Sequence, residues 1–201
     1  MSAELFLALA GFAAVTLFTP GPNNMMLLAS GANFGFRATL GHLFGVALGF
    51  ALMAFMCGVG LIGIFELFPA LETVLKAVSV VFLGWLAWKI AHAAAPADIA
   101  ADETRLARPI GFWQAAAFQW VNPKAWTMAL TAIAAYAPER SLLAVFVVAA
   151  TFLALGLCSA SVWTLLGREA RRILSDPRRL TLFNRTMAAL LVATLVPVLF
   201  A

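Results

Sequence analysis

The sequence predicts an all-α integral membrane protein, and two observations carry that prediction. Of its 201 residues, 64% are hydrophobic and only 11% are charged, and the mean hydropathy is +0.98. A water-soluble domain of this length needs far more polar surface to cover its core, so lipid is the solvent that fits this composition. The apolar residues also gather into runs of about 20, the length of a helix that crosses the hydrocarbon core.

Six of these apolar runs are expected to be transmembrane helices. Their boundaries are 4–31, 39–64, 71–91, 111–135, 141–166 and 184–200. The first run is long because a proline-rich stretch interrupts it. The other runs are separated by charged or turn-forming stretches, of which the polar linker 96–109 is the longest and divides the chain near its middle.

Lysine and arginine lie mainly in the loops that follow odd-numbered segments. Ten of the thirteen basic residues occupy these loops and their flanks: Arg37, Lys89, Arg105, Arg108, Arg168, Arg171, Arg172, Arg178, Arg179 and Arg185. Lys76 and Arg140 lie on the other side, and Lys124 falls within a segment. Because cytoplasmic loops carry the excess of basic residues, we expect both termini to lie outside. Cations placed beside lipid headgroups argue against nucleic acid as a partner.

This topology gives the two halves of the chain opposite orientations. The halves are about 1–95 and 110–201, on either side of a cytoplasmic linker at 96–109. Inverted halves of three helices are a recurring architecture of secondary transporters. We therefore expect a single membrane transporter domain over 1–201, built from six transmembrane helices as two inverted three-helix halves, with the first and fourth helices broken.

Two prolines break the first helix. The candidate binding residues there are consecutive: Thr19, Pro20, Gly21, Pro22, Asn23 and Asn24. Proline frees carbonyls in a region without water, which is tolerated only where protein buries them or a cavity meets them. The break then offers carbonyl acceptors on one side and a half-helix N-terminus on the other, as a zwitterion requires. A kink that only shapes packing is the alternative.

The fourth helix is expected to break at Asn122, Pro123 and Lys124. Lys124 is ionisable and lies near the middle of a segment, where a charge costs about 3 kcal/mol or more. It is a candidate to bind a carboxylate or to couple transport to an ion. The alternative is a lysine that snorkels or satisfies the carbonyls freed by Pro123. Trp120 and Trp126 flank this break, and either line a cavity or pack.

The second helix carries three glycines and a histidine. Gly41, Gly45 and Gly49 share one helix face, where small residues allow close packing within the chain or in a possible homodimer, and we expect the former. His42 is a second coupling candidate because histidine titrates near neutral pH, although an interfacial role is commoner at a segment end. No Asp or Glu falls in the middle of a segment, so the sequence offers no buried carboxylate as a proton carrier.

Several motifs resemble those of one transporter family. PGPN in the first segment, GFR after it, the glycine-rich second segment, WLAWKI closing the third and NPK in the fourth resemble the LysE/RhtB family of amino-acid exporters. TPGPNN, WLAWKIA and the following IGFW are most similar to its cysteine and O-acetylserine exporter branch. The resemblance implies export of small amino acids or their relatives from the cytoplasm, driven by an ion gradient.

We therefore expect a secondary transporter that exports small neutral amino acids or derivatives, of cysteine/O-acetylserine or homoserine/threonine type, by proton antiport across the inner membrane of a bacterium. A carrier of another small solute or cation, or a channel-like pore, is the alternative. Cys57 and Cys158 are separated, without CxxC or a His/Cys cluster, so we expect no metal site and no cofactor. Ser159 and Ser161 lie in apolar sequence without a His or Asp nearby in the chain that could act as a base, so we expect that the protein is not an enzyme.

Overall fold

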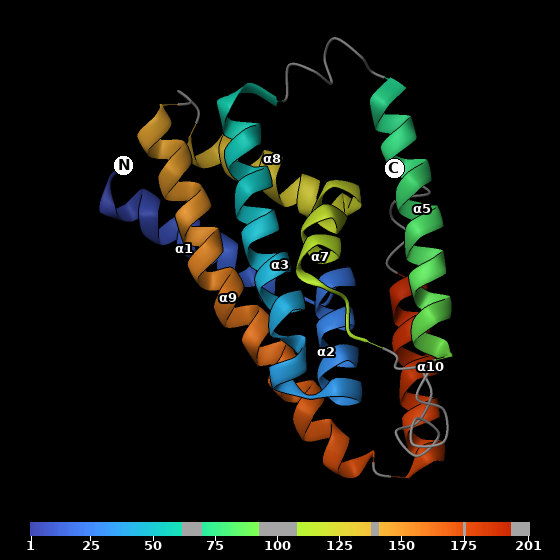
Figure 1. Ribbon diagram of the computed structural model, residues 1–201. Coiled ribbons are helices and arrows are strands. Elements are labelled where there is room, and N and C mark those ends of the chain that lie inside the picture. The colour runs from blue at the N-terminus through green and yellow to red at the C-terminus, as the bar shows by residue number, and fades with distance from the viewer. Residues whose placement is uncertain (62–69, 93–107, 138–140, 175, 194–201) are drawn as a thin grey trace.

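The computed structural model describes residues 1–61, 70–92, 108–137, 141–174 and 176–193 (Figure 1). Every regular element within these ranges is a helix, which confirms the predicted all-α class. Two helices, Phe36–Gly60 and Leu142–Ala170, are long and apolar enough to cross a membrane. A bent pair, Ala3–Phe18 with Pro22–Phe34, meets the same criterion as one broken span.

The helices follow the predicted order of the six apolar runs. Their bounds are α1 Ala3–Phe18, α2 Pro22–Phe34, α3 Phe36–Met56 with the π-helical turn η1 Cys57–Leu61, α5 Ala70–Ala91, α7 Phe112–Phe118, the 3-10 turn η3 Gln119–Val121, α8 Pro123–Tyr136, α9 Leu142–Ile173 and α10 Pro177–Ala193. Most of the predicted linker 96–109 and the ends of the second and sixth predicted segments lie outside the described residues.

Both predicted helix breaks are present. α1 and α2 meet at an angle of 56°. Thr19 is extended where α1 ends, and Pro22 occupies the first turn of α2, where a missing N–H costs no hydrogen bond. The second break has the same local cause, since Asn122 is extended (φ −93°, ψ 109°) and Pro123 begins α8. The Asn122 side chain caps α8 by accepting a hydrogen bond from the Lys124 backbone N–H at 3.2 Å.

The arginine-rich stretch between the fifth and sixth predicted segments is helical rather than a loop. α9 runs to Ile173, beyond the predicted end at 166, and α10 begins at Pro177, before the predicted start at 184. The Asp176 carboxylate accepts a hydrogen bond from the Arg178 backbone N–H at 2.7 Å and so caps α10. Hydropathy misplaced these boundaries because arginine favours a helix as much as apolar residues do, but lowers the hydropathy.

α3 and α9 form the centre of the fold, with α1, α2, α7 and α8 packed around them (Figure 1). Phe50 and Phe152 connect the two central helices, with ring centroids 5.1 Å apart. On the α7 side, a Cβ added at Gly49 would lie 2.6 Å from the Ala116 Cα, and one at Gly45 would overlap the Phe112 carbonyl. Gly45 and Gly49 therefore serve packing within the chain, as predicted, whereas Gly41 is exposed and a Cβ there would lie an ordinary 3.6 Å from the Phe112 N.

α2 and α9 approach closely at two further glycines. A Cβ added at Gly31 would overlap the Thr164 carbonyl, and one at Gly167 would overlap the Leu28 carbonyl. Each helix thus presents a glycine to the backbone of the other. Beside this core, α5 and α10 pack against each other, and α10 also contacts α2.

Four helix termini gather at one end of the molecule, the lower end in Figure 1. α2 and α9 end there, and α3 and α10 begin there. The residues at these termini include Arg37, Arg168, Arg178 and Arg179, all exposed. Exposed arginines of α3, α9 and α10 therefore lie near this end of the helices.

Candidate functional site

The two helix breaks meet at a partly open cavity of about 40 Å³. Residues of α1, α2, α3, α8, α9 and both breaks line it. Its polar residues are Thr16, Asn23, Asn24, Asn122, Lys124 and Ser159, together with the Gly21 backbone. Segments at opposite ends of the sequence thus build one site.

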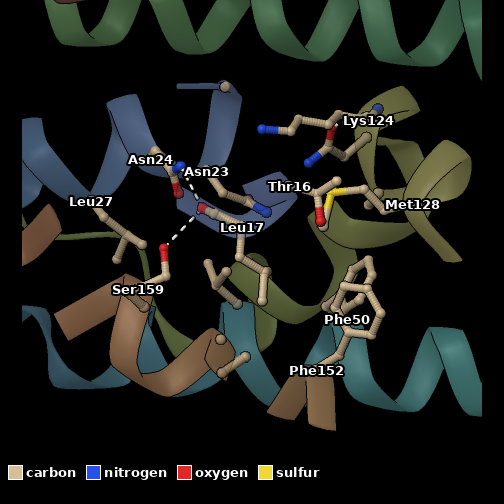
Figure 2. A pocket seen from close by; sticks show the side chains of 17 residues that line it. Thr16, Leu17, Asn23, Asn24, Leu27, Phe50, Lys124, Met128, Phe152 and Ser159 are labelled. Carbon is tan, nitrogen blue, oxygen red and sulfur yellow. Dashed lines mark hydrogen bonds between the residues drawn. The ribbon is translucent and has the colours of Figure 1, made fainter. Parts of the chain in front are cut away.

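Side chains replace the backbone donors that are missing at the first break. Asn24 Nδ2 donates to the carbonyls of Leu17 and Thr19, at 2.9 Å each. The Ser159 hydroxyl, from α9, donates to the same Leu17 carbonyl at 2.8 Å (Figure 2). Buried carbonyls without partners are costly in a membrane, so these bonds stabilise the break. The Leu17 carbonyl could not be predicted as the partner of Ser159, because it lies in another helix.

Lys124 connects the second break to the first. Its Nζ donates to the Thr19 carbonyl at 2.7 Å and approaches the Pro20 carbonyl at 3.5 Å. Gly21 makes room for this side chain, because a Cβ there would lie 2.8 Å from the Lys124 Cδ. The lysine amino group therefore binds carbonyls of the first break rather than those freed by Pro123, which was one of the two structural alternatives. It binds carbonyls at the C-terminal end of α1.

A reciprocal amide pair forms a second connection between the breaks. Asn23 Nδ2 donates to Gln119 Oε1 at 2.8 Å, and Gln119 Nε2 donates to Asn23 Oδ1 at 3.2 Å. Gln119 is fully buried, and its Nε2 also donates to the Ala115 carbonyl at 2.8 Å. Sequence analysis missed Gln119. The signal was an amide in an apolar segment shortly before Pro123.

The far side of the cavity is apolar. Phe50 and Phe152 form it, and the apolar side chains of Leu27, Val46 and Met128 also line the cavity. Figure 2 shows Phe50 and Phe152 opposite Asn23, Asn24 and Lys124. Among the lining residues, Lys124 is the one that is ionisable, and no carboxylate is present. The cavity therefore joins a polar side to an uncharged hydrophobic side.

Some of the predicted site residues line the cavity, and others do not. Five of them line the cavity: Gly21, Asn23, Asn24, Asn122 and Lys124. Thr19 and Pro20 offer their carbonyls to Lys124, whereas Pro22 and Pro123 start α2 and α8 and do not line the cavity. Trp120 and Trp126 do not line it either and pack against the core, where Trp126 Nε1 donates to the Trp120 carbonyl at 2.8 Å.

His42, the second coupling candidate, lies apart from the cavity. It is fully buried in α3, so its side chain packs inside the protein. At this end of the fold α9 extends past the start of α3 (Figure 1). Neither ring nitrogen has a hydrogen-bond partner in the described residues. The same residues hold no group of three His, Cys, Asp or Glu side chains that could bind a metal ion.

Two broken helices that meet at a cavity are typical of one class of integral membrane protein, the secondary transporters. A family model described as LysE type translocator matches residues 14–199, and the chain belongs to this family. It is therefore a transporter and not an enzyme.

Curated relatives extend over most of the chain. It is 31% identical over 194 residues to the cysteine/O-acetylserine efflux protein of Escherichia coli (strain K12), which covers 96% of each chain. It is 33% identical over 136 residues to the protein of that name in Salmonella typhimurium, covering 68% of this chain and 67% of the relative. No solved structure matches the chain at a significant level.

Proposed function

We propose that this protein exports small neutral amino acids or their derivatives, of the cysteine/O-acetylserine type, from the cytoplasm across the inner membrane by proton antiport. The observation that carries this function is the two-sided cavity at the helix breaks. Its polar side has carbonyl acceptors, amide side chains and one lysine, and its other side is apolar and without charge. The names of its relatives agree with a substrate of this size and polarity.

A zwitterion matches the polar side group by group. The carbonyls that end α1 accept hydrogen bonds from an ammonium. The side-chain amides of Asn23 and Asn122 and the first N–H groups of α2 are donors for a carboxylate. A short uncharged side chain then lies against Phe50, Met128 and Phe152. A charged side chain is disfavoured there because it would lose its hydration without gaining a partner.

The transport mechanism we propose is alternating access between two inverted halves, about 1–95 and 110–201. The contact between the breaks lies where the two halves meet, because Thr19 and Lys124 belong to different halves. The exposed arginines at one end of the helices support a cytoplasmic position for that end and an outside position for both termini. Lys124 and His42 are the candidates for coupling substrate movement to the proton gradient.

Efflux from proteoliposomes tests this function. The vesicles are loaded with cysteine, O-acetylserine, homoserine, threonine, leucine and lysine, with and without an imposed pH gradient. We expect selective loss of one or a few neutral amino acids, accelerated by the gradient. Loss of none, or equal loss of all, contradicts the proposal and favours another solute or a channel-like pore.

Site variants connect efflux to the cavity. Asn23→Ala and Lys124→Ala are expected to abolish efflux while folded protein remains in the membrane. Thr127→Ala is the matched control, because Thr127 is exposed on α8 and its hydroxyl bonds only to its own helix at the Pro123 carbonyl, 3.1 Å away. Full activity in both site variants would refute the assignment of the site.

A further inference from the structure

The ammonium group of Lys124 lies where the proposed function requires an ammonium group of the substrate. It donates to the Thr19 carbonyl at 2.7 Å and approaches the Pro20 carbonyl at 3.5 Å. We propose that these two carbonyls form a subsite for a primary ammonium group, and that Lys124 fills this subsite as a tethered substitute whenever substrate is absent. This inference rests on the proposed function, in which the substrate carries an ammonium group.

The hydrogen-bond capacity of Thr19 makes the two ammonium groups competitors. A carbonyl oxygen has two lone pairs. The Thr19 oxygen already accepts one bond from Asn24 Nδ2 at 2.9 Å and a second from Lys124 Nζ at 2.7 Å. A substrate ammonium therefore cannot add to this oxygen as a third donor. It would have to displace Asn24 Nδ2 or Lys124 Nζ, and Lys124 is the donor whose ammonium group it matches.

Gly21 leaves space for the Lys124 side chain to approach the two carbonyls. A Cβ at this position would lie 2.8 Å from the Lys124 Cδ and 3.0 Å from its Nζ. A side chain at position 21 would therefore require the flexible end of Lys124 to shift. Gly21, Asn24 and Lys124 all line the cavity, whereas Thr19 and Pro20 do not, so the two carbonyls lie next to the cavity and within reach of the Lys124 side chain.

The chemistry of the subsite selects primary ammonium compounds. Carbonyls at the C-terminal end of a helix carry partial negative charge and favour a cation that donates hydrogen bonds. When a substrate ammonium takes this position, Lys124 is released and becomes available to the substrate carboxylate. The substrate ammonium replaces the Lys124 ammonium on the Thr19 and Pro20 carbonyls. These carbonyls therefore accept hydrogen bonds both with substrate and without it.

Chemical rescue of Lys124→Ala tests the subsite without requiring transport. The full chain is purified, and its thermal unfolding is followed while ethylammonium chloride is added. Tetramethylammonium chloride, a cation without N–H groups, controls for ionic strength. Lys89→Ala is the control variant, because Lys89 is a lysine of α5 that lies over the Trp85 ring, outside the cavity.

We expect ethylammonium to raise the midpoint temperature of thermal unfolding of Lys124→Ala in a saturable way. The midpoint temperatures of the wild type and of Lys89→Ala should not change. The tetramethylammonium salt should not reproduce the effect. Absence of rescue, or equal rescue of Lys89→Ala, would overturn the inference. If Lys124→Ala does not fold, the yield of monodisperse protein extracted with ethylammonium, against that with tetramethylammonium, gives the same comparison.

The outcome is independent of the efflux assay. Rescue without efflux of any amino acid would retain the ammonium subsite and refute the proposed substrate. Efflux without rescue would retain the proposed function and refute the role of Lys124 as a substitute for the substrate ammonium.

Discussion

The amide pair Asn23–Gln119 allows a double-mutant test of how the two breaks are held together. Each alanine substitution removes both hydrogen bonds of the pair, which measure 2.8 and 3.2 Å. Interhelical hydrogen bonds in membranes contribute about 0.6 kcal/mol each on average. The two bonds therefore predict a coupling free energy of about 1 kcal/mol. Each single variant should lose more than that, because it leaves a buried amide partly unpaired.

The assay is reversible unfolding in mixed micelles of the wild type, Asn23→Ala, Gln119→Ala and the double variant. The coupling free energy between Asn23 and Gln119 is calculated from the free energies of unfolding of these four proteins. Single-variant effects that add within about 0.3 kcal/mol would refute the pairing, because distant independent sites add to that accuracy.

A second reciprocal pair supplies the control. Asn33 Nδ2 donates to Asn184 Oδ1 at 2.9 Å, and Asn184 Nδ2 donates to Asn33 Oδ1 at 3.2 Å, between α2 and α10 and outside the cavity lining. This pair should give a similar coupling free energy. Efflux should fall on loss of Asn23 and persist on loss of Asn184, in proteins matched for the amount folded. Equal effects on efflux would mean that the cavity pair acts through stability alone.

Three further predictions concern packing and the walls of the cavity. Gly49→Ala should lower the free energy of unfolding by about 1–3 kcal/mol, because its Cβ requires the facing helices to separate, whereas Gly84→Ala, with nothing within 4 Å, should not; equal effects in unfolding titrations would contradict this. Ser159→Ala should cost about 1 kcal/mol by removing a bond to the Leu17 carbonyl, and an unchanged midpoint would contradict it. Phe50→Leu enlarges the apolar side, so the ratio of leucine to O-acetylserine efflux should rise; a constant ratio would exclude Phe50 from selectivity.

The helix breaks were predictable because their cause is local. A proline lacks its N–H wherever the chain goes, so Pro20, Pro22 and Pro123 predict the interruptions without knowledge of the fold. Helix class and the order of the segments follow from composition and run length in the same way. The predicted segment boundaries at 166 and 184 were less accurate. A helix continues past its apolar residues when the residues that follow favour a helix and the end of the helix is capped.

The partners of the site residues were not predictable, because they depend on how distant segments approach each other. The lysine side chain is long and flexible, and its acceptor, the Thr19 carbonyl, is fixed only when the second break meets the first. Gln119 and Ser159 sit in apolar segments where an amide or a hydroxyl also commonly bonds to its own helix. The structure adds their bonds to Asn23 and Leu17.

The interlocked glycines of α2 and α9 determine which part of the first broken helix is free to turn. Sliding α2 along α9 by one residue would drive a side chain into backbone at Gly31 or Gly167, so the two helices travel as one body. Thr19–Gly21 lies between α1 and that body and belongs to neither helix. The bend at the break therefore sets the angle of α1 against α2, whose position along α9 these glycines fix.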